Sequence, residues 1–512
     1  MSKPHILVFP YPAQGHMLPL LDLTHKLALY GLTITIIITP NNLPTLEPLL
    51  TTHTTTIHTL TLPFPSHPNL PAGAENVREV GNTGNYPFIN ALSKLQTPII
   101  QWFRSQINPP LALISDFFLG WTQQLADKIG IKRIAFFSSG AFLTAVSHHC
   151  WRNLLPLPPQ TTEFEFPGLP GTPSFPREHL PSIFLRYKDS DPDAELVKEG
   201  FAFANPTSWA SVFNTFQALE EPYLNHLRAD LKPRRVLAVG PLGFNRADQS
   251  LNEKGHDTLL RWLNKWEEGA VLYVCFGSQK VLTKQQMEGL ALGLERSMIP
   301  FVWVVKEGCG PVPDGFAERV SGRGLVVRSW APQVAILGHR AVGGFLSHCG
   351  WNSVLEAVTA RVMILGWPME ADQFVNARLL VKDMGVGVTV CEGASLTPDP
   401  DELGRAIAGT MGPENPRRRK AKWLREEAAK AVGNGGQSSK ELDELVELLV
   451  LLSVKEEGCW YFLAEIEGLE QKSDSEVEEG LQMLLDFDLP ALKVNFLELQ
   501  ESKWHALNCV GK

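Results

Sequence analysis

The chain has few cysteines, and none of them stands in a Cys-x-x-Cys pair. An odd number scattered over 512 residues does not predict a disulfide framework, and no pair has the spacing of zinc ligands. This usage fits a reducing compartment. The seven cysteines are Cys150, Cys275, Cys309, Cys349, Cys391, Cys459 and Cys509.

Long apolar runs are also absent. No window approaches the roughly 20 uninterrupted apolar residues that a membrane helix needs. The first residues, MSKPHILVFPYPAQGH, hold only a short apolar run before Pro10 and Pro12, without a small-residue cleavage site. We therefore expect a cytoplasmic protein without a membrane span.

An excess of positive charge is missing as well. The formal net charge is −9, but residues 454–512 alone hold 13 Asp and Glu residues against five Lys. Residues 1–453 are thus nearly neutral and show no basic patch, so we expect no nucleic-acid partner.

The length is sufficient for two cores, because single cores stop growing at roughly 250–300 residues. In the first half, apolar runs alternate with segments of helical periodicity, which predicts a parallel sheet covered on both faces. The expected strands are His5–Phe9, Leu32–Thr39, Leu111–Ser115 and Arg133–Phe137, and the expected helices are Leu18–Leu29 and Leu119–Ile129.

A second series follows the polar, linker-like stretch Phe244–Thr258. It contains a helix at Lys284–Ser297 and strands at Val271–Phe276, Phe301–Val305, Leu325–Arg328 and Gly344–Ser347. We predict an α/β fold of two doubly wound, Rossmann-like domains, residues 1–242 and 243–453, facing across a cleft. Ligands of such sheets bind at the carboxyl ends of the strands.

A proline-dense stretch, residues 156–181, has too few periodic residues for a helix. We expect an irregular loop there. This loop either lies near the acceptor side of the expected cleft or is a solvent-exposed loop that contacts no substrate.

The 44 positions from Trp330 to Gln373 combine three features: Trp-Ala-Pro-Gln at 330–333, GFLSHCGWNS at 344–353 and WPMEADQ at 367–373. An indole can stack on a base, a helix start with Ser and Asn can hold a diphosphate, and Asp beside Gln can bind sugar hydroxyls. The residues leave two structural alternatives: Trp330 as a core residue, and Ser353-Val-Leu-Glu356 as a capping box with Asn352 as an ordinary cap.

This run resembles the donor-binding signature of plant UDP-dependent glycosyltransferases of small molecules, a family with the GT-B fold. The resemblance implies that Trp330 stacks on uracil, Ala331 binds its edge and Gln333 contacts the ribose side. It further implies phosphate contacts for Ser278, which follows a predicted strand, and for His348, Asn352 and Ser353. The other donor-binding residues that it implies are Trp351, Glu356 at the ribose, and Asp372 and Gln373 at the sugar.

Gln at position 373 is associated in that family with glucose, so UDP-glucose is the expected donor. No metal or other cofactor is expected, because the chain lacks a DxD-type metal motif in a suitable context and because His348 and Cys349 have no partner pair with ligand spacing. The family would also place the helix pattern that ends near Leu452 back against the first domain.

His16 follows Pro-Ala-Gln-Gly in the loop expected after the first strand, and its imidazole can accept a hydroxyl proton at neutral pH. Asp116, at the end of another strand of the same sheet, can orient that ring. The resemblance assigns His16 as general base, and we predict an inverting transfer assisted by Asp116. A helix cap is the alternative role for Asp116. His5, at the start of the expected strand, and His25, inside the expected helix, are the other nearby histidines, and we do not assign either as the base.

The acceptor is expected to be a small phenol such as a flavonoid. Aromatic residues near the predicted base would suit a flat ring, although strand-end aromatics are often core: Phe117, Phe118, Trp121, Phe136, Phe137, Phe142 and Trp151. A sterol or hormone acceptor and a non-catalytic UDP-sugar-binding protein are the alternatives. We expect a monomer, and we predict that the acidic tail 454–512, which departs from the family pattern, is dispensable for activity.

Overall fold

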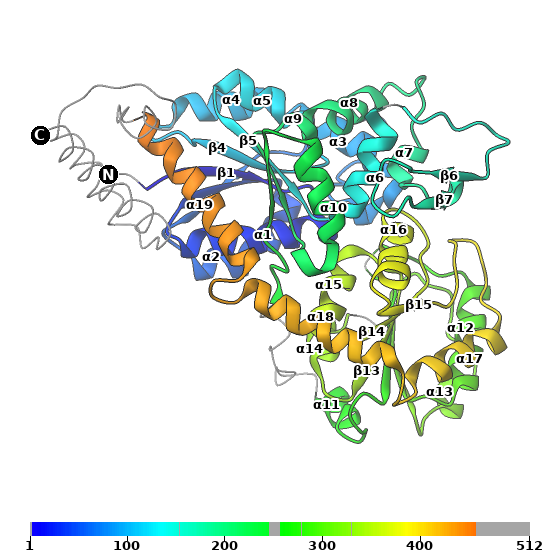
Figure 1. Cartoon of the computed structure of the whole chain (residues 1–512). Helices are drawn as coiled ribbons and strands as arrows, with labels where there is room; N and C mark the ends of the chain where they lie inside the picture. Colours follow the sequence, from blue (N-terminus) through cyan, green and yellow to red (C-terminus); the bar gives the residue numbers. More distant parts are fainter. Residues whose placement is uncertain (1–2, 153, 245–256, 278, 329, 457–512) are drawn as a thin grey trace, which may run out of the picture.

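The computed structural model describes residues 3–152, 154–244, 257–277, 279–328 and 330–456. Two parallel sheets, each flanked by helices, form an upper and a lower body in Figure 1. The predicted class, two doubly wound α/β domains, is confirmed. The acidic tail beyond residue 456 lies outside the described residues.

The first sheet has the strand order β3-β2-β1-β4-β5-β8-β9, with every pairing parallel. Its central strands are buried along their length because helices cover both faces, which is why they read as continuous apolar runs. The strands are β1 His5–Phe9, β2 Thr33–Ile38, β3 Ile57–Thr61, β4 Ala112–Asp116, β5 Lys132–Phe137, β8 Ala210–Phe213 and β9 Arg235–Ala238.

The second sheet has the order β12-β11-β10-β13-β14-β15 and is also parallel throughout. The strands are β10 Val271–Cys275, β11 Phe301–Val305, β12 Gly324–Arg328, β13 Val342–Ser347, β14 Met363–Gly366 and β15 Gly387–Thr389.

The helices that belong with the first sheet are α1 Gln14–Leu29, α2 Glu47–Thr52, α3 Asn85–Ser93, α4 Gln96–Ser105, α5 Thr122–Ile129, α6 Ala141–Arg152, α7 Ser182–Leu185, α8 Ala194–Glu199, α9 Asn205–Thr207 and α10 Gln217–Asp230. Those that follow are α11 Asp257–Leu263, α12 Lys284–Ser297, α13 Phe316–Arg319, α14 Gln333–Gly338, α15 Trp351–Thr359, α16 Gln373–Arg378, α17 Pro400–Met411, α18 Pro416–Val432 and α19 Gln437–Glu456.

The first helix starts earlier than its sequence pattern indicates. It was expected from Leu18, but α1 begins at Gln14, so His16 lies in its first turn and not in the preceding loop. Gly15 and Pro19 caused this error, because both are typical of loops. Pro19 is accommodated inside the helix, although it has no N–H to donate to the carbonyl of Gly15 four residues earlier.

The proline-dense stretch is not wholly irregular. It contains a two-stranded antiparallel hairpin of β6 (Glu163–Glu165) and β7 (Ser174–Pro176), followed by a 3₁₀ turn at Arg177–His179. Strands of three residues are too short to show alternation between prolines. The stretch also contacts the second body: His179 stacks on Phe374 of α16 with ring centroids 3.9 Å apart.

The last described helix, α19, lies against the first sheet, beside α1 and α2 in Figure 1. Its apolar residues Leu445, Val446 and Leu449 are buried in one cluster with residues of β1 and α1. Glu441 accepts hydrogen bonds from Arg228 of α10 and from the backbone N–H of Ala238. Helix α19 thus ties the end of the second body to the first.

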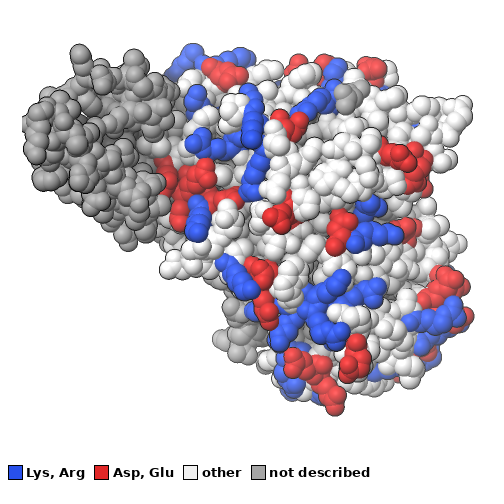
Figure 2. Space-filling view, in the orientation of Figure 1, with Lys and Arg blue, Asp and Glu red and all other residues white. Residues whose placement is uncertain are grey.

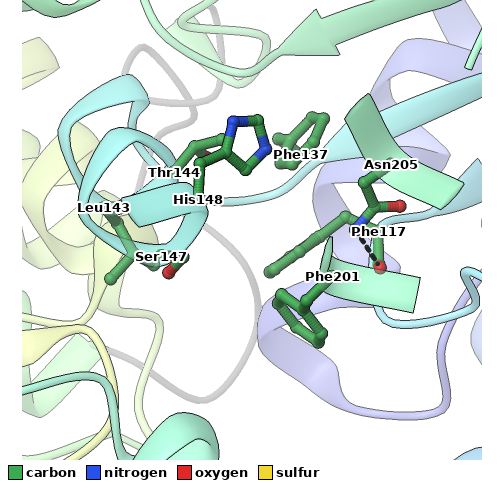
Figure 3. A pocket seen from close by; sticks show the side chains of 8 residues that line it. All are labelled: Phe117, Phe137, Leu143, Thr144, Ser147, His148, Phe201 and Asn205. Atoms are coloured by element: carbon green, nitrogen blue, oxygen red, sulfur yellow. Dashed lines mark hydrogen bonds between the residues drawn. The ribbon is translucent and has the colours of Figure 1, made fainter. Parts of the chain in front are cut away.

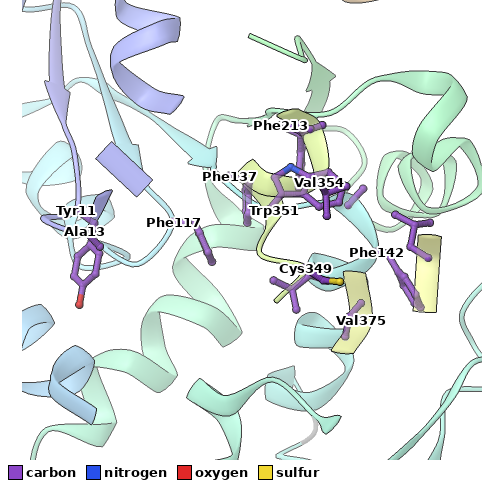
Figure 4. Packing of buried hydrophobic residues seen from close by; sticks show 14 of the residues in the cluster. Tyr11, Ala13, Phe117, Phe137, Phe142, Phe213, Cys349, Trp351, Val354 and Val375 are labelled. Carbon is purple, nitrogen blue, oxygen red and sulfur yellow. The ribbon is translucent and has the colours of Figure 1, made fainter. Parts of the chain in front are cut away.

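A single hydrophobic cluster crosses the interface between the two bodies. Figure 4 shows Trp351, Val354 and Val375 of the second body in one group with Phe137, Phe142 and Phe213 of the first. Acidic and basic side chains are interspersed on the face seen in Figure 2. In the part of the chain that the structure describes, no helix has both the length and the apolar character needed to cross a membrane.

Candidate active site

The predicted base and its carboxylate partner are in direct contact. His16 Nδ1 lies 3.0 Å from Asp116 Oδ2 and 3.1 Å from Oδ1. The Asp116 side chain is fully buried at the end of β4, whereas that of His16 is 21% exposed in the first turn of α1. With Nδ1 engaged by the carboxylate, Nε2 is the nitrogen of His16 that can accept a proton from a substrate.

Asp116 is not the helix cap that was its alternative role, because α5 begins only at Thr122 with Trp121 at the cap position. Its Oδ1 instead accepts a hydrogen bond of 2.9 Å from the backbone N–H of Phe118 in a turn that follows β4. Sequence reasoning missed Ser138, whose Oγ lies 3.2 Å from His16 Nδ1. Ser138 directly follows β5, next to β4 in the sheet, and this position at a strand's carboxyl end was the available signal.

Aromatic rings enclose the imidazole of His16. Phe117 stacks on it with centroids 5.4 Å apart, and Phe118 and Tyr11 lie at 4.6 and 5.3 Å. The predicted aromatic group therefore divides. Phe117 and Phe118 flank the base, whereas Trp121, Phe136, Phe142 and Trp151 are buried as core.

Next to Phe117 lies a pocket between α6 and the segment around Phe201 (Figure 3). Leu143, Thr144, Ser147 and His148 border it from α6, and Phe117, Phe201 and Asn205 face them, with Phe137 at the edge. Its volume is about 10 Å³, room for a single water molecule or a hydroxyl group but not for a ring. Phe117, one of its walls, also stacks on His16.

The helix of the predicted diphosphate site, α15, begins at Trp351 after Gly350, and no side chain caps it. The alternative capping box is therefore not formed: Asn352 and Ser353 lie inside the first turn. The unpaired N–H groups of this turn carry partial positive charge, which favours an anion.

Two hydrogen bonds hold the start of α15 against the first body. Asn352 Nδ2 donates to the carbonyl of Gly15 at 3.1 Å, and this is the carbonyl that Pro19 leaves without its helical donor. Trp351 Nε1 donates to the carbonyl of Asn214 at 2.8 Å, after β8. Helices α15 and α1 thus meet directly.

The indole of Trp351, predicted to be a donor contact, is only 3% exposed and packs between the two bodies. Gly140 makes room for it, because a Cβ at that position would lie 2.8 Å from the ring. The backbone N–H of Trp351, at the first position of α15, donates to the carboxylate of Asp372.

His348 follows β13, and its ring lies between two glycines. A Cβ at Gly277 would lie 2.8 Å from ring atom Cε1, and one at Gly350 would lie 2.7 Å from Nε2. Burial lowers the pKa of His348 to about 4, so the ring is neutral at pH 7 and can donate one hydrogen bond without adding charge.

The predicted ribose residues form a network at the start of α14. Gln333 Nε2 donates to Glu356 Oε2 at 2.6 Å and lies 3.4 Å from Ser353 Oγ, while Tyr273 donates to Gln333 Oε1. Ala331 is buried, but Trp330 is 72% exposed, which contradicts its alternative role as a core residue. The structure brings Gln333, Ser353 and Glu356 together.

Asp372 and Gln373, the predicted sugar residues, stand before and at the start of α16. Gln373 Oε1 accepts hydrogen bonds from the backbone N–H groups of Met369 and Glu370, which leaves the amide NH₂ as a donor. Burial raises the pKa of Asp372, an effect opposed by a hydrogen bond from Asn376 and by the charge of His16. The carboxylate of Asp372 is thus close enough to His16 for the two side chains to interact electrostatically.

The predicted phosphate residue Ser278 lies outside the described residues. Within the described ranges, no group of three or more His, Cys, Asp or Glu side chains has an arrangement that could hold a metal ion.

Three comparisons place this architecture among known proteins. Residues 251–399 match the family model described as UDP-glucoronosyl and UDP-glucosyl transferase. UDP-glycosyltransferase 89A2 of Arabidopsis thaliana is 55% identical over 413 residues, 80% of this chain and 88% of that protein. Flavonol 3-O-glucosyltransferase UGT89B1 of the same plant is 45% identical over 472 residues, 88% of this chain and 98% of that protein.

The crystal structure of Arabidopsis thaliana UGT89C1 complexed with UDP-L-rhamnose is 35% identical, with a TM-score of 0.72 over 88% of this chain and 100% of that one. The same protein has been solved complexed with quercetin. Two facing parallel sheets of this kind define the GT-B class. The chain belongs to the plant family 1 UDP-glycosyltransferases and resembles their UGT89 group, so it is an enzyme that transfers a sugar from a UDP-sugar to a small molecule.

The buried hydrogen bond of Trp351 can be tested with Trp351→Phe, which keeps an aromatic ring but leaves the Asn214 carbonyl unpaired. We expect the free energy of unfolding to fall by about 1–3 kcal/mol in urea denaturation. Trp423→Phe is the control, because that indole is 45% exposed on α18. Equal effects of the two substitutions would mean that the interdomain hydrogen bond adds no stability.

Proposed function

We propose that the enzyme transfers glucose from UDP-glucose to a hydroxyl of a small phenolic acceptor, such as a flavonoid, with inversion at the anomeric carbon. Residues 1–242 would bind the acceptor and residues 243–453 the donor, in a monomer. The observation that carries the proposal is the pairing of His16 with Asp116 among aromatic rings and next to the start of α15.

In the proposed step, His16 Nε2 removes the acceptor's hydroxyl proton while Asp116 holds Nδ1 and stabilises the imidazolium that forms. The acceptor oxygen forms a bond to the anomeric carbon as the bond from that carbon to the phosphate oxygen breaks. UDP leaves with the electron pair. One displacement on an α-linked donor gives a β-linked product.

The departing diphosphate gains negative charge. Uncharged hydrogen-bond donors of the protein would stabilise that charge. The N–H groups at the start of α15 and the uncharged ring of His348 supply such donors, and a preorganised array of this kind needs no rearrangement during the reaction. Trp330 at the end of β12 would stack on uracil, with Ala331 at its edge. Gln333 and Glu356 would bind the ribose.

Glucose is proposed from Gln373, whose amide NH₂ and the neighbouring carboxylate of Asp372 offer a donor and an acceptor for adjacent sugar hydroxyls. The phenolic acceptor is supported by the aromatic rings around His16 and by the flavonol activity named for one relative and the quercetin complex of another.

The proposal is tested by incubating the full chain with UDP-glucose, UDP-galactose or UDP-rhamnose and a panel of flavonols, simple phenols and sterols. Mass spectrometry should show a hexose added to phenols with UDP-glucose, at a higher kcat/KM than with the other two donors. Transfer mainly to sterols, or mainly from UDP-rhamnose, would overturn the acceptor or the donor assignment respectively.

The base is tested with His16→Ala. We expect kcat to fall by about 10²–10⁴-fold while UDP still binds in calorimetry, because the helix start that faces the diphosphate is untouched. Asp116→Asn should also lose most activity, since an amide does not hold the same tautomer of the ring. His25→Ala, on the same helix, is the control and should stay active. Full turnover by His16→Ala would contradict the assignment.

A further inference from the structure

One polar side chain of the pocket beside Phe117 has no role in the proposed chemistry. His148 lies on α6 and borders the pocket together with Ser147, opposite Phe117 and Phe201 (Figure 3). It is 6% exposed, so its imidazole is part of the wall and not of the outer surface.

Neither ring nitrogen of His148 has a hydrogen-bond partner among the residues that the structure describes. Other polar side chains of the same wall are satisfied within the protein. Asn205 Nδ2 donates to the carbonyl of Phe117 at 2.9 Å, and Thr144 Oγ1 donates to that of Gly140 at 3.2 Å. Buried polar groups without partners are rare in proteins, so His148 stands out from its neighbours.

The charged groups near His148 do not supply the missing partner. Arg152, one turn further along α6, forms a two-point ion pair with Asp230 of α10 at 2.8 and 2.9 Å. Burial, with help from the charges of Arg152 and His226, lowers the pKa of His148 to about 4. The imidazole is therefore neutral at pH 7 and presents one donor and one acceptor.

A second unpartnered donor lies nearby. Trp151, three residues after His148 on α6, stacks on Phe201 with centroids 5.4 Å apart, and its Nε1 also lacks a partner among the described residues. Phe201 and Phe117 are both walls of the pocket, and Phe117 stacks on His16. The pocket thus has polar side chains of α6 in one wall, and Phe117 in its other wall contacts His16.

We infer that His148 is a specificity-determining residue that hydrogen-bonds an oxygen of the acceptor remote from the hydroxyl that is glycosylated. This inference rests on the proposed function. The favoured substrates are then aromatic compounds with two or more separated oxygen groups, and simple monophenols are poor substrates because they leave the imidazole unpaired. A site built to hydrogen-bond a substrate discriminates strongly against the analogue that lacks the group.

The test compares wild type, His148→Phe and His148→Gln on a polyhydroxylated flavonol and on a monophenol. For the flavonol, His148→Phe should lower kcat/KM by about 10-fold or more, mainly through KM, while the value for the monophenol stays within about twofold. His148→Gln keeps a donor and an acceptor and should retain part of the preference. His149→Phe is the matched control, because His149 packs on Phe166 and does not border the pocket.

Fluorescence titration of each acceptor, without turnover, gives an independent readout, and melting temperatures identify variants that are merely unfolded. Equal losses for both acceptors in folded His148→Phe, or an unchanged preference, would overturn the inference: His148 would then be a structural residue, for instance one that binds only water. If wild type transfers glucose to neither phenol, the proposed function itself fails. If wild type is active but its preference between the two acceptors does not change with the residue at position 148, only the inference about His148 is refuted and the proposed function stands.

Discussion

The arrangement of the site depends on how the start of α15 is held against the first domain. Pro19 cannot donate to the carbonyl of Gly15, and Asn352 from the other domain takes that place. Trp351 donates to the carbonyl of Asn214, which follows β8, three strands from β1 in the sheet. With both hydrogen bonds in place, α15 cannot shift without disturbing the first turn of α1. That turn carries His16, so in the proposed reaction the same contacts set the distance between the base and the donor.

The site contains little permanent positive charge. The carboxylate of Asp116 is buried against His16, the proposed base, whereas burial keeps His348 neutral near the start of α15. In the proposed reaction, helix N–H groups and neutral rings would stabilise the leaving group as its charge develops. Two further contacts join the domains away from the site. His179, in the turn after the β6–β7 hairpin, stacks on Phe374, and α19 packs on the first sheet.

The sequence predicted the repeated elements well, because strands such as His5–Phe9 and Phe301–Val305 are buried on both faces and read as continuous apolar runs. It failed where local signals compete with tertiary contacts. Gly15 and Pro19 favour a loop locally, yet packing of Leu20, Leu23 and Leu27 stabilises a helix from Gln14. Trp351 donates to a backbone carbonyl 137 positions away, and the pocket at His148 is closed by Phe117 and Phe201 from other elements. Spacing along the chain predicts neither contact.

The proposed reaction is a single displacement at the anomeric carbon, in which a base from the first domain and a donor bound to the second meet at the interface between them. The anomeric configuration of the product tests this most directly. Proton NMR of the glucoside formed from UDP-α-glucose should show the large anomeric coupling of a β-linked sugar, formed by a single inversion. An α-linked product would contradict the account, because retention requires a second displacement or a different attacking group.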